Sequence, residues 1–343
     1  MPSSFRQPAQ NKQALPRRRF LHTIGKVAGA IACSLALPTA ARAATSRLSK
    51  PVRLGLIADL HHDVMHDAPA RLAAFLKEMA VDPPDAIIQL GDFAQAKEKN
   101  RALVKQFRDA HPVALHVIGN HDTDSGISFD QLLKEWGMKS RYYKHDIKNL
   151  RLLVLDGNET PPDHKGGYPS YVGPKQIEWL QKELGSHDGP FLIFCHQPLA
   201  GPFAIKNSEQ VQKILNGFAD QIILTINGHT HIDDLIQTGD VAHLHVNSAS
   251  YQWVGGNHRH LSYPAEIHAA NPWIEYTCPY RDPLFTTLTF DPDSGEVQLE
   301  GRKTAWVGKS PEQVGVANQP GVIDGQQVVA EIRPRKIPRK IKQ

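Results

Sequence analysis

The sequence has few cysteines, few aromatic residues and no long uninterrupted apolar segment. Among its 343 residues it contains three cysteines, and 7% of the residues are aromatic. The length suits one large domain or two small ones, and no internal segment reaches the roughly 18 consecutive apolar residues that a membrane-spanning helix needs. The low aromatic content and the 25 prolines favour long loops over an all-helical bundle. No internal repeat is present.

The cysteines do not predict a particular disulfide. Cys33 belongs to the N-terminal segment, and Cys195 ends an apolar strand-like stretch, where a small buried residue is expected. Cys278 and Cys195 remain after the N-terminal segment is set aside. Both a disulfide between them and two free thiols stay open.

Positive charge is concentrated at the two ends of the chain. Residues 1–43 hold seven lysines and arginines and no acidic residue, and residues 333–343 hold six more basic residues. The net charge of +4 therefore arises from two basic ends around a body with a net charge of −9. An acidic body argues against a nucleic-acid-binding protein. The basic, Pro-interrupted C-terminal end predicts a disordered tail.

The N-terminal segment has the three parts of an export signal in their usual order. Consecutive arginines at 17–19 precede a mildly apolar run over residues 24–37, and Ala-Arg-Ala at 41–43 follows as a candidate cleavage site. The paired arginines and the weak apolar run resemble a twin-arginine signal. We predict a signal peptide over residues 1–43, the twin-arginine export machinery as a partner, and a periplasmic or secreted mature protein without a membrane span.

Two alternatives exist for this segment. One is a basic tail before a short helix. The other is a lipoprotein signal through Cys33, which is disfavoured because Ala30 stands where a large aliphatic residue is preferred.

Strand-like and helix-like stretches alternate after the N-terminal segment. Strands are predicted at residues 52–58, 86–90, 113–118, 142–147, 151–155, 191–194 and 221–226. Amphipathic helices are predicted at residues 69–80, 101–110, 129–136, 174–184 and 208–216. Strands at 233–237, 241–246, 284–290 and 296–301 then follow without intervening helices. This order predicts an α/β fold with one mixed sheet or two packed sheets flanked by helices.

Five short polar clusters each follow one of the predicted buried strands. Ligands bind outside the carboxyl ends of the strands in open α/β sheets, so these clusters can converge although they are far apart in sequence. Carboxylate, amide oxygen and imidazole are ligands of hard or borderline divalent metals. The clusters contain Asp59 and His61, Asp92, Asn120 with His121 and Asp122, His196, and His229 and His231. We predict a single dinuclear metal site.

In order and spacing, the clusters resemble the signature of the calcineurin-like metallophosphoesterases over about residues 52–246. The resemblance implies a sandwich of two mixed β-sheets flanked by α-helices. It also implies a metallophosphoesterase domain at 44–305, followed by a C-terminal extension with the basic tail at 306–343. One metal would be held by residues Asp59, His61, Asp92 and His231, and the second by Asp92, Asn120, His196 and His229.

The resemblance further implies an enzyme that hydrolyses phosphate mono- or diesters of small molecules. A metal-bridging hydroxide would attack phosphorus directly, and His121, which is not a ligand, would assist the leaving group. Asp122 is expected to orient an imidazole. We expect two divalent or trivalent ions, Fe, Mn or Zn, and the sequence leaves the choice among them open, because Asp, Asn and His ligands without cysteine accept any of them.

Two departures from related families narrow the prediction. Gln95 stands where purple acid phosphatases have a tyrosine three residues after the aspartate, and Asp92 lacks the Gly-Asp-x-x-Asp-Arg-Gly context of protein Ser/Thr phosphatases. A cyclic-nucleotide or other phosphodiesterase is the main alternative, and a noncatalytic metal-stabilised binding protein is the alternative from another class.

Two segments are expected to determine the substrate. These are residues 156–171 and the long aromatic-rich stretch 248–283, which we expect to be ordered near the site. Four other histidines are expected on the surface rather than at the site, and Arg259 is a weaker candidate for a phosphate contact. These histidines are His62, His66, His258 and His260.

Overall fold

Two six-stranded sheets form the centre of the fold in the computed structural model, which describes residues 39–316 and 327–337. The first sheet has the order β16-β13-β12-β1-β2-β3. Its strands are β1 (Val52–Ile57), β2 (Ala86–Gln89), β3 (Ala114–His116), β12 (Thr286–Asp291), β13 (Glu296–Leu299) and β16 (Arg335–Ile337). The second sheet has the order β4-β5-β6-β7-β9-β8. Its strands are β4 (Tyr143–Ile147), β5 (Leu150–Val154), β6 (Phe191–Phe194), β7 (Ile222–Asn227), β8 (Asp234–Thr238) and β9 (Val241–His245).

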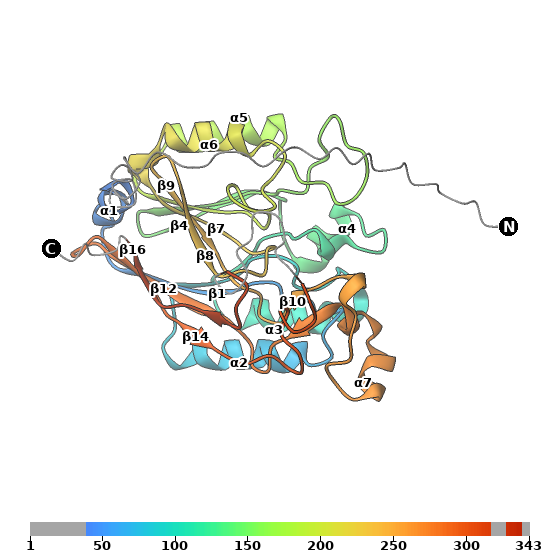
Figure 1. Cartoon of the computed structure of the whole chain (residues 1–343). Coiled ribbons are helices and arrows are strands. Elements are labelled where there is room, and N and C mark those ends of the chain that lie inside the picture. The colour runs from blue at the N-terminus through green and yellow to red at the C-terminus, as the bar shows by residue number, and fades with distance from the viewer. Residues whose placement is uncertain (1–38, 317–326, 338–343) are drawn as a thin grey trace, which may run out of the picture. The chain divides into compact units, whose positions relative to one another are not determined.

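The two sheets pack face to face, and helices cover their outer faces. Figure 1 shows α5 and α6 above the sheets and α2 and α3 below them. The main helices are α2 (Ala68–Val81), α3 (Arg101–Asp109), α4 (Phe129–Trp136), α5 (Pro174–Gly185) and α6 (Ser208–Asn216). The prediction of two mixed sheets flanked by helices is therefore confirmed. Helices α4 and α6 have the predicted bounds, and the other three differ by one residue at one or both ends.

Alternation along the strands explains this layering, because successive side chains of a strand point to opposite faces. Leu54 and Leu56 of β1 share one apolar cluster with Val154 and Phe194 of the second sheet. Ile57 and Ile87, which point the other way, join the cluster beneath α2 and α3, and a third cluster lies beneath α5 and α6. The core is thus three apolar layers in a four-layer α/β/β/α arrangement.

Parallel pairing brings the carboxyl ends of the central strands to common edges. Strands β1, β2 and β3 are parallel, and so are β5, β6, β7 and β9. The His196 ring joins the two edges, since its Nδ1 lies 2.8 Å from the carbonyl oxygen of Leu90 in the other sheet. The loops after β1, β2, β3, β6 and β7, which hold the five polar clusters, therefore meet at one end of the sandwich.

Smaller elements complete the described chain. Two short sheets pair β10 (Tyr251–Trp253) with β11 (Thr277–Pro279) and β14 (Arg302–Lys303) with β15 (Glu331–Ile332). Short α-helices are α1 (Thr39–Ser46) and α7 (Ala265–Ala270). The 3₁₀ turns are η2 (Glu98–Asn100), η3 (His121–Thr123), η4 (Ala219–Gln221), η5 (Gly256–His258) and η6 (Pro272–Tyr276). Segment 248–283, expected to be ordered, contains β10, β11, α7, η5 and η6.

The C-terminal end differs from the prediction of a disordered basic tail. Strand β16 extends the first sheet by pairing with β13, and β15 pairs with β14. Arg333 and Arg335 both bind the fully buried carboxylate of Asp233, with Nε–Oδ2 and Nη1–Oδ1 distances of 2.5 Å. A buried carboxylate needs positive partners, and these two arginines supply them, so residues 327–337 are ordered. Residues 338–343 lie outside the described part of the chain.

The predicted signal peptide falls mostly outside the described residues, because residues 1–38 are not described. Its last residues, 39–43, form the start of α1, where Ala41 is buried. In the described ranges, no helix has the length and apolar character that crossing a bilayer requires. Cys195 and Cys278 are both buried and are not joined by a disulfide.

Replacing Arg335 by methionine tests the contribution of the Asp233 contact to stability. The change removes one of the two arginines that balance the buried carboxylate of Asp233, so we expect the free energy of unfolding to fall by about 2–3 kcal/mol. Urea unfolding followed by circular dichroism measures this. Lys336→Met on the same strand is the control, since its side chain is 57% exposed and its Nζ lies 3.7 Å from Glu296. Equal stabilities for the two variants would contradict the role given to Arg335.

Candidate metal centre

Asp59, His61 and His231 form the first group of candidate ligands. The first two lie in the loop after β1, and His231 lies in the loop after β7. Nε2 of His61 is 3.1 Å from Nε2 of His231, and the latter atom is 3.3 Å from Oδ1 of Asp59. All three side chains are buried, so their ligand atoms face one small space.

Asp92, His196 and His229 form the second group, whose ligand atoms all lie within 4.8 Å of one another. Asp92 follows β2, and its Oδ2 is 3.2 Å from Nε2 of His196. The same oxygen is 3.8 Å from Nε2 of His61 in the first group. Asp92 is therefore placed between the groups, as the predicted bridging ligand must be.

Asn120 supplies a further observation that a cation fits here. Its side chain is 4% exposed, and its Oδ1 has no hydrogen-bond partner among the described residues. A buried amide oxygen without a partner is costly, and a cation beside the second group would satisfy it. The seven predicted ligands offer only carboxylate, amide and imidazole atoms, the donor set that suits Fe, Mn or Zn.

Strained backbone is concentrated in these loops. Eight non-glycine residues of the described chain have a positive φ angle, and five of them are predicted ligands: Asp59, His61, Asp92, His229 and His231. Each such conformation costs of the order of 1–3 kcal/mol and persists only where the surrounding structure imposes it. A positive φ angle turns the chain sharply. It therefore allows a residue that directly follows a strand to point its side chain into the site.

Two glycines permit the close approach of neighbouring loops. A Cβ atom at Gly119 would collide with the backbone nitrogen of Asp92, and one at Gly228 would meet the Asp59 carboxylate. Asp92 and Asp59 are candidate ligands, so these glycines are part of the site's geometry rather than simple turn residues.

Asp122 has a different role from the predicted one. Its carboxylate accepts hydrogen bonds from the backbone amides of Gly119, Phe93, Asp92 and Ala94, at 2.7, 2.8, 3.1 and 3.1 Å. It makes no hydrogen bond to an imidazole among the described residues. The expectation that Asp122 orients an imidazole is therefore corrected, because its side chain instead holds the loop of Asp92 against the loop of Asn120.

The carboxylate that does contact the non-ligand histidine is Asp124. Nδ1 of His121 lies 2.7 Å from Oδ2 of Asp124, and the Tyr168 hydroxyl donates to Oδ1 of Asp124 at 2.8 Å. Sequence reasoning missed both Asp124 and Tyr168. A carboxylate three residues after His121 was a usable signal, whereas Tyr168 is brought in only by the fold.

Electrostatics at His121 follow from these neighbours. Burial lowers the pKa of His121, but the carboxylates of Asp92 and Asp124 outweigh it and raise that pKa to about 9. Burial raises the pKa of Asp92, but the nearby imidazoles of His196 and His121 hold it well below its ordinary value. In the protein without metal, Asp92 is thus ionised and His121 is protonated near neutral pH.

A cavity of about 690 Å³ opens onto these residues. The candidate ligands His61, Asp92, His229 and His231 line it, together with His121. Both segments expected to determine the substrate contribute to its wall, through Tyr168 and through a set from 248–283: Tyr251, Gln252, Trp253 and Trp273.

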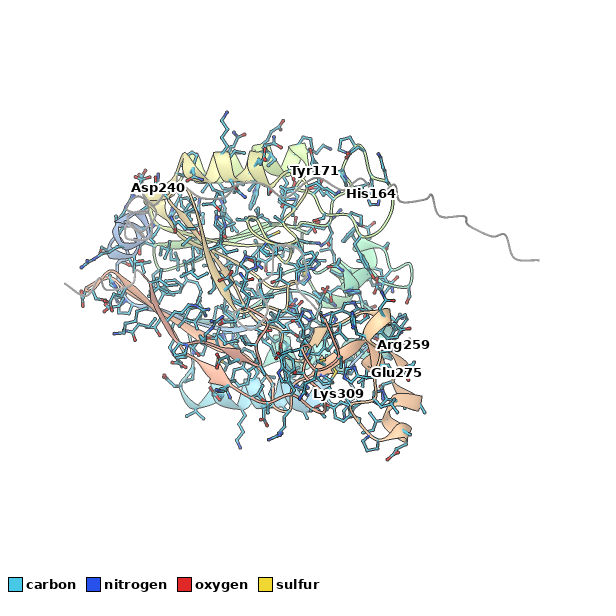
Figure 2. The ribbon with its side chains drawn as sticks, in the orientation of Figure 1. His164, Tyr171, Asp240, Arg259, Glu275 and Lys309 are labelled. Carbon is cyan, nitrogen blue, oxygen red and sulfur yellow. The ribbon has the colours of Figure 1, made fainter. Side chains whose placement is uncertain are left out.

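The other histidines considered from sequence mostly lie away from the cavity. His62 lines it, but His66, His258 and His260 do not. Arg259, labelled near Glu275 in Figure 2, is also absent from the lining, and its guanidinium lies 5.7 Å from the centre of the Tyr276 ring. A phosphate contact by Arg259 therefore has no support in the described geometry.

The family model of the calcineurin-like phosphoesterases matches residues 52–233, more than half of the chain. The chain belongs to this family. It is accordingly a metal-dependent phosphoester hydrolase, and the dinuclear metal dependence of the calcineurin-like phosphoesterases agrees with the two groups of ligands described above.

Individual relatives of this calcineurin-like phosphoesterase are distant. It is 24% identical over 214 residues to a probable cyclic nucleotide phosphodiesterase of Fibrobacter succinogenes, which covers 56% of this chain and 77% of the relative. A dimetal phosphatase of Danio rerio has a TM-score of 0.50 and 15% identity, over 75% of this chain and 98% of the other. The anchor protein of the Plasmodium inner membrane complex also has a TM-score of 0.50, with 12% identity, over 83% of this chain and 90% of the other. These two structures share the fold.

The position of Asp92 between the groups predicts its effect on metal content. We expect elemental analysis of the metal-loaded protein to give about two metal ions per chain. We expect Asp92→Asn to hold fewer than about one, because loss of a shared charged ligand weakens both positions. Asp124→Asn is the matched control and should keep the wild-type content. An Asp92→Asn protein with undiminished metal would show that Asp92 is not a shared ligand.

Proposed function

We propose that the protein hydrolyses phosphate mono- or diesters of small molecules in one step, with His121 assisting departure of the alcohol. The observation that carries this proposal is the position of His121. Its ring centre lies 5.4 Å from that of the candidate ligand His61, its side chain is 42% exposed, and it lines the cavity. It belongs to neither ligand group, so its imidazole is available to a substrate.

The protein's own residues define the proposed reaction. Asp59, His61, Asp92 and His231 would hold one ion, and Asp92, Asn120, His196 and His229 the other. Bound there, the two ions would supply a water of lowered pKa and positive charge against the phosphoryl oxygens.

In the proposed reaction, His121 supplies the proton that the leaving alcohol needs. A water that has lost one proton to the solvent forms the new bond from its oxygen to phosphorus, and the bond from phosphorus to the alcohol oxygen breaks. His121 gives that oxygen its proton and then takes a new one from the solvent. Asp124 supports this role because it accepts a hydrogen bond from His121 Nδ1, which leaves the proton on the other ring nitrogen as the one that His121 can give to the alcohol.

The charges of the cavity favour a diester over a monoester. Of the residues described by the structure, no lysine or arginine lines the cavity, whereas Asp63 and Asp124 do. A monoester carries up to one more negative charge than a diester, and no lysine or arginine in the lining would balance it. The similarity to a probable cyclic nucleotide phosphodiesterase supports the same alternative.

We also propose export through the twin-arginine pathway, followed by removal of residues 1–43. The support is the sequence of residues 17–43 described above. Ala41 and Ala44 are buried in α1, and proteases cut backbone that is exposed or locally unfolded. Processing after Ala43 therefore requires α1 to open first.

Replacing His121 by alanine tests the catalytic proposal. We expect kcat on bis-p-nitrophenyl phosphate to fall about 10²–10⁴-fold without loss of metal, because the leaving oxygen no longer receives a proton. Asp124→Asn should give a smaller fall, and mono-p-nitrophenyl phosphate should be the poorer substrate of the wild-type protein. His66→Ala, an exposed histidine outside the cavity, is the control. Unchanged turnover in metal-loaded His121→Ala would disprove the assigned role.

Export is tested with the full chain in a bacterium that has the twin-arginine machinery. We expect the protein in the periplasm or medium to begin at Ala44, as N-terminal sequencing would show. Replacing Arg17 and Arg18 by lysine should retain the unprocessed chain in the cytoplasm, whereas Arg6→Lys should not. Export of the doubly substituted chain at the wild-type level would rule out this pathway.

A further inference from the structure

Exposed aromatic side chains are gathered at the cavity. Among the described residues, six large apolar side chains are exposed, and four of these line the cavity: Tyr168, Phe203, Trp253 and Trp273. We call these four the aromatic rim. Their exposed fractions are 50%, 50%, 40% and 55%. Single exposed apolar residues are ordinary on a protein surface, but four at the mouth of one cavity indicate a binding surface.

A row of ring contacts connects the candidate metal ligands to part of the rim. Tyr251 stacks on His61, with ring centres 4.8 Å apart, and its centre is 5.0 Å from that of His231. Trp253 follows at 6.4 Å from Tyr251. Only the ring of Tyr251 therefore separates Trp253 of the rim from the candidate metal ligands. A group attached to a phosphate at the metal site can reach the rim over this distance.

The two tryptophans of the rim are held by a shared neighbour. Trp253 is stacked on Tyr276 at 5.6 Å with an angle of 10° between the rings, and Trp273 lies 5.2 Å from Tyr276. Packing of this kind fixes the orientation of each indole while leaving about half of its surface exposed. Such pre-oriented rings lose little conformational entropy when a planar ligand stacks on them.

Of the other two rim residues, Tyr168 is held by contacts and Phe203 has an unusual backbone conformation. The Tyr168 hydroxyl donates to Asp124, and its ring lies 4.7 Å from that of His121. Phe203 has a φ of +57°, a conformation that a bulky residue rarely adopts, and yet its ring is half exposed. Backbone strain that leaves an apolar ring in solvent brings no gain in packing, and strain of this kind is associated with binding sites.

The lining beyond the metal ligands offers rings rather than positive charge. Within the described residues it contains no lysine or arginine that could bind a second phosphate. A substrate that fills this part of the cavity therefore gains more from a planar apolar group than from additional negative charge. Stacking of such a group on an aromatic side chain changes affinity by roughly 5- to 150-fold.

We propose that the aromatic rim binds a planar ring on the ester arm that remains attached to phosphorus, so that the substrate is a phosphodiester with an aryl or nucleobase group. This proposal rests on the proposed phosphoesterase function and adds a substrate class to it. Trp253 and Trp273 act as specificity residues, since they contact the ring and not the reacting atoms.

Two diesters with the same leaving group test the proposal: phenyl p-nitrophenyl phosphate and ethyl p-nitrophenyl phosphate. After division by their rates of alkaline hydrolysis, we expect kcat/KM to be about tenfold higher for the phenyl ester. Trp253→Ala combined with Trp273→Ala should reduce this ratio toward one, and Trp253→Phe should largely keep it. Leu261→Ala is the matched control, because Leu261 is 63% exposed in the same segment but does not line the cavity.

A binding measurement separates the proposal from the proposed function. We expect isothermal titration calorimetry of the metal-loaded protein to show tighter binding of diphenyl phosphate than of diethyl phosphate, and the double tryptophan variant to lose this preference. Hydrolysis of both nitrophenyl esters without a ring preference would overturn the ring site alone. A ring preference in binding without hydrolysis of any ester would overturn the phosphoesterase function alone. A preference that survives the double substitution would overturn the assignment to the tryptophans.

Discussion

The burial of one carboxylate where the loops of the two sheets meet is the constraint on which the site depends. Asp92 is 3% exposed, and an ion with so little contact with water is stable only with charged or hydrogen-bonding partners. Its Oδ2 faces His61 and His196, and its Oδ1 accepts the backbone amide of His121 at 2.8 Å. These partners come from three separate loops, so satisfying Asp92 requires the loops to converge.

The sandwich supplies the rigidity that this convergence demands. Strained backbone at five candidate ligands is tolerated because the strands before them are fixed in apolar layers. Asp122 braces the loop of Asp92 with four amide hydrogen bonds. Asp233, two residues after His231, is held by Arg335 of β16 and by Arg333 in the connection before that strand. The charged end of the chain thus stabilises a loop that carries candidate ligands.

The proposed substrate contacts belong to a different part of the molecule from the candidate metal ligands. The ligands lie directly after strands, whereas Tyr168, Trp253 and Trp273 come from long connections that are not part of either large sheet. Connections of this kind can change without disturbing the sandwich. A shared fold therefore says little about the ester that is cleaved.

Periodicity and local clusters in the sequence alone determined the strand and helix order and nine candidate site residues, because both signals are contained within a few neighbouring residues. Only the tertiary structure decided which of the carboxylates of Asp122 and Asp124 contacts the imidazole of His121 and which contacts backbone amides. Asp122 and Asp124 are equally plausible partners of His121 in sequence, but side-chain direction sends one to the backbone of Asp92 and the other to the imidazole. Likewise, the composition of the basic end predicts disorder. Its buried partner Asp233 lies 100 residues earlier in the sequence and is brought to it only by folding.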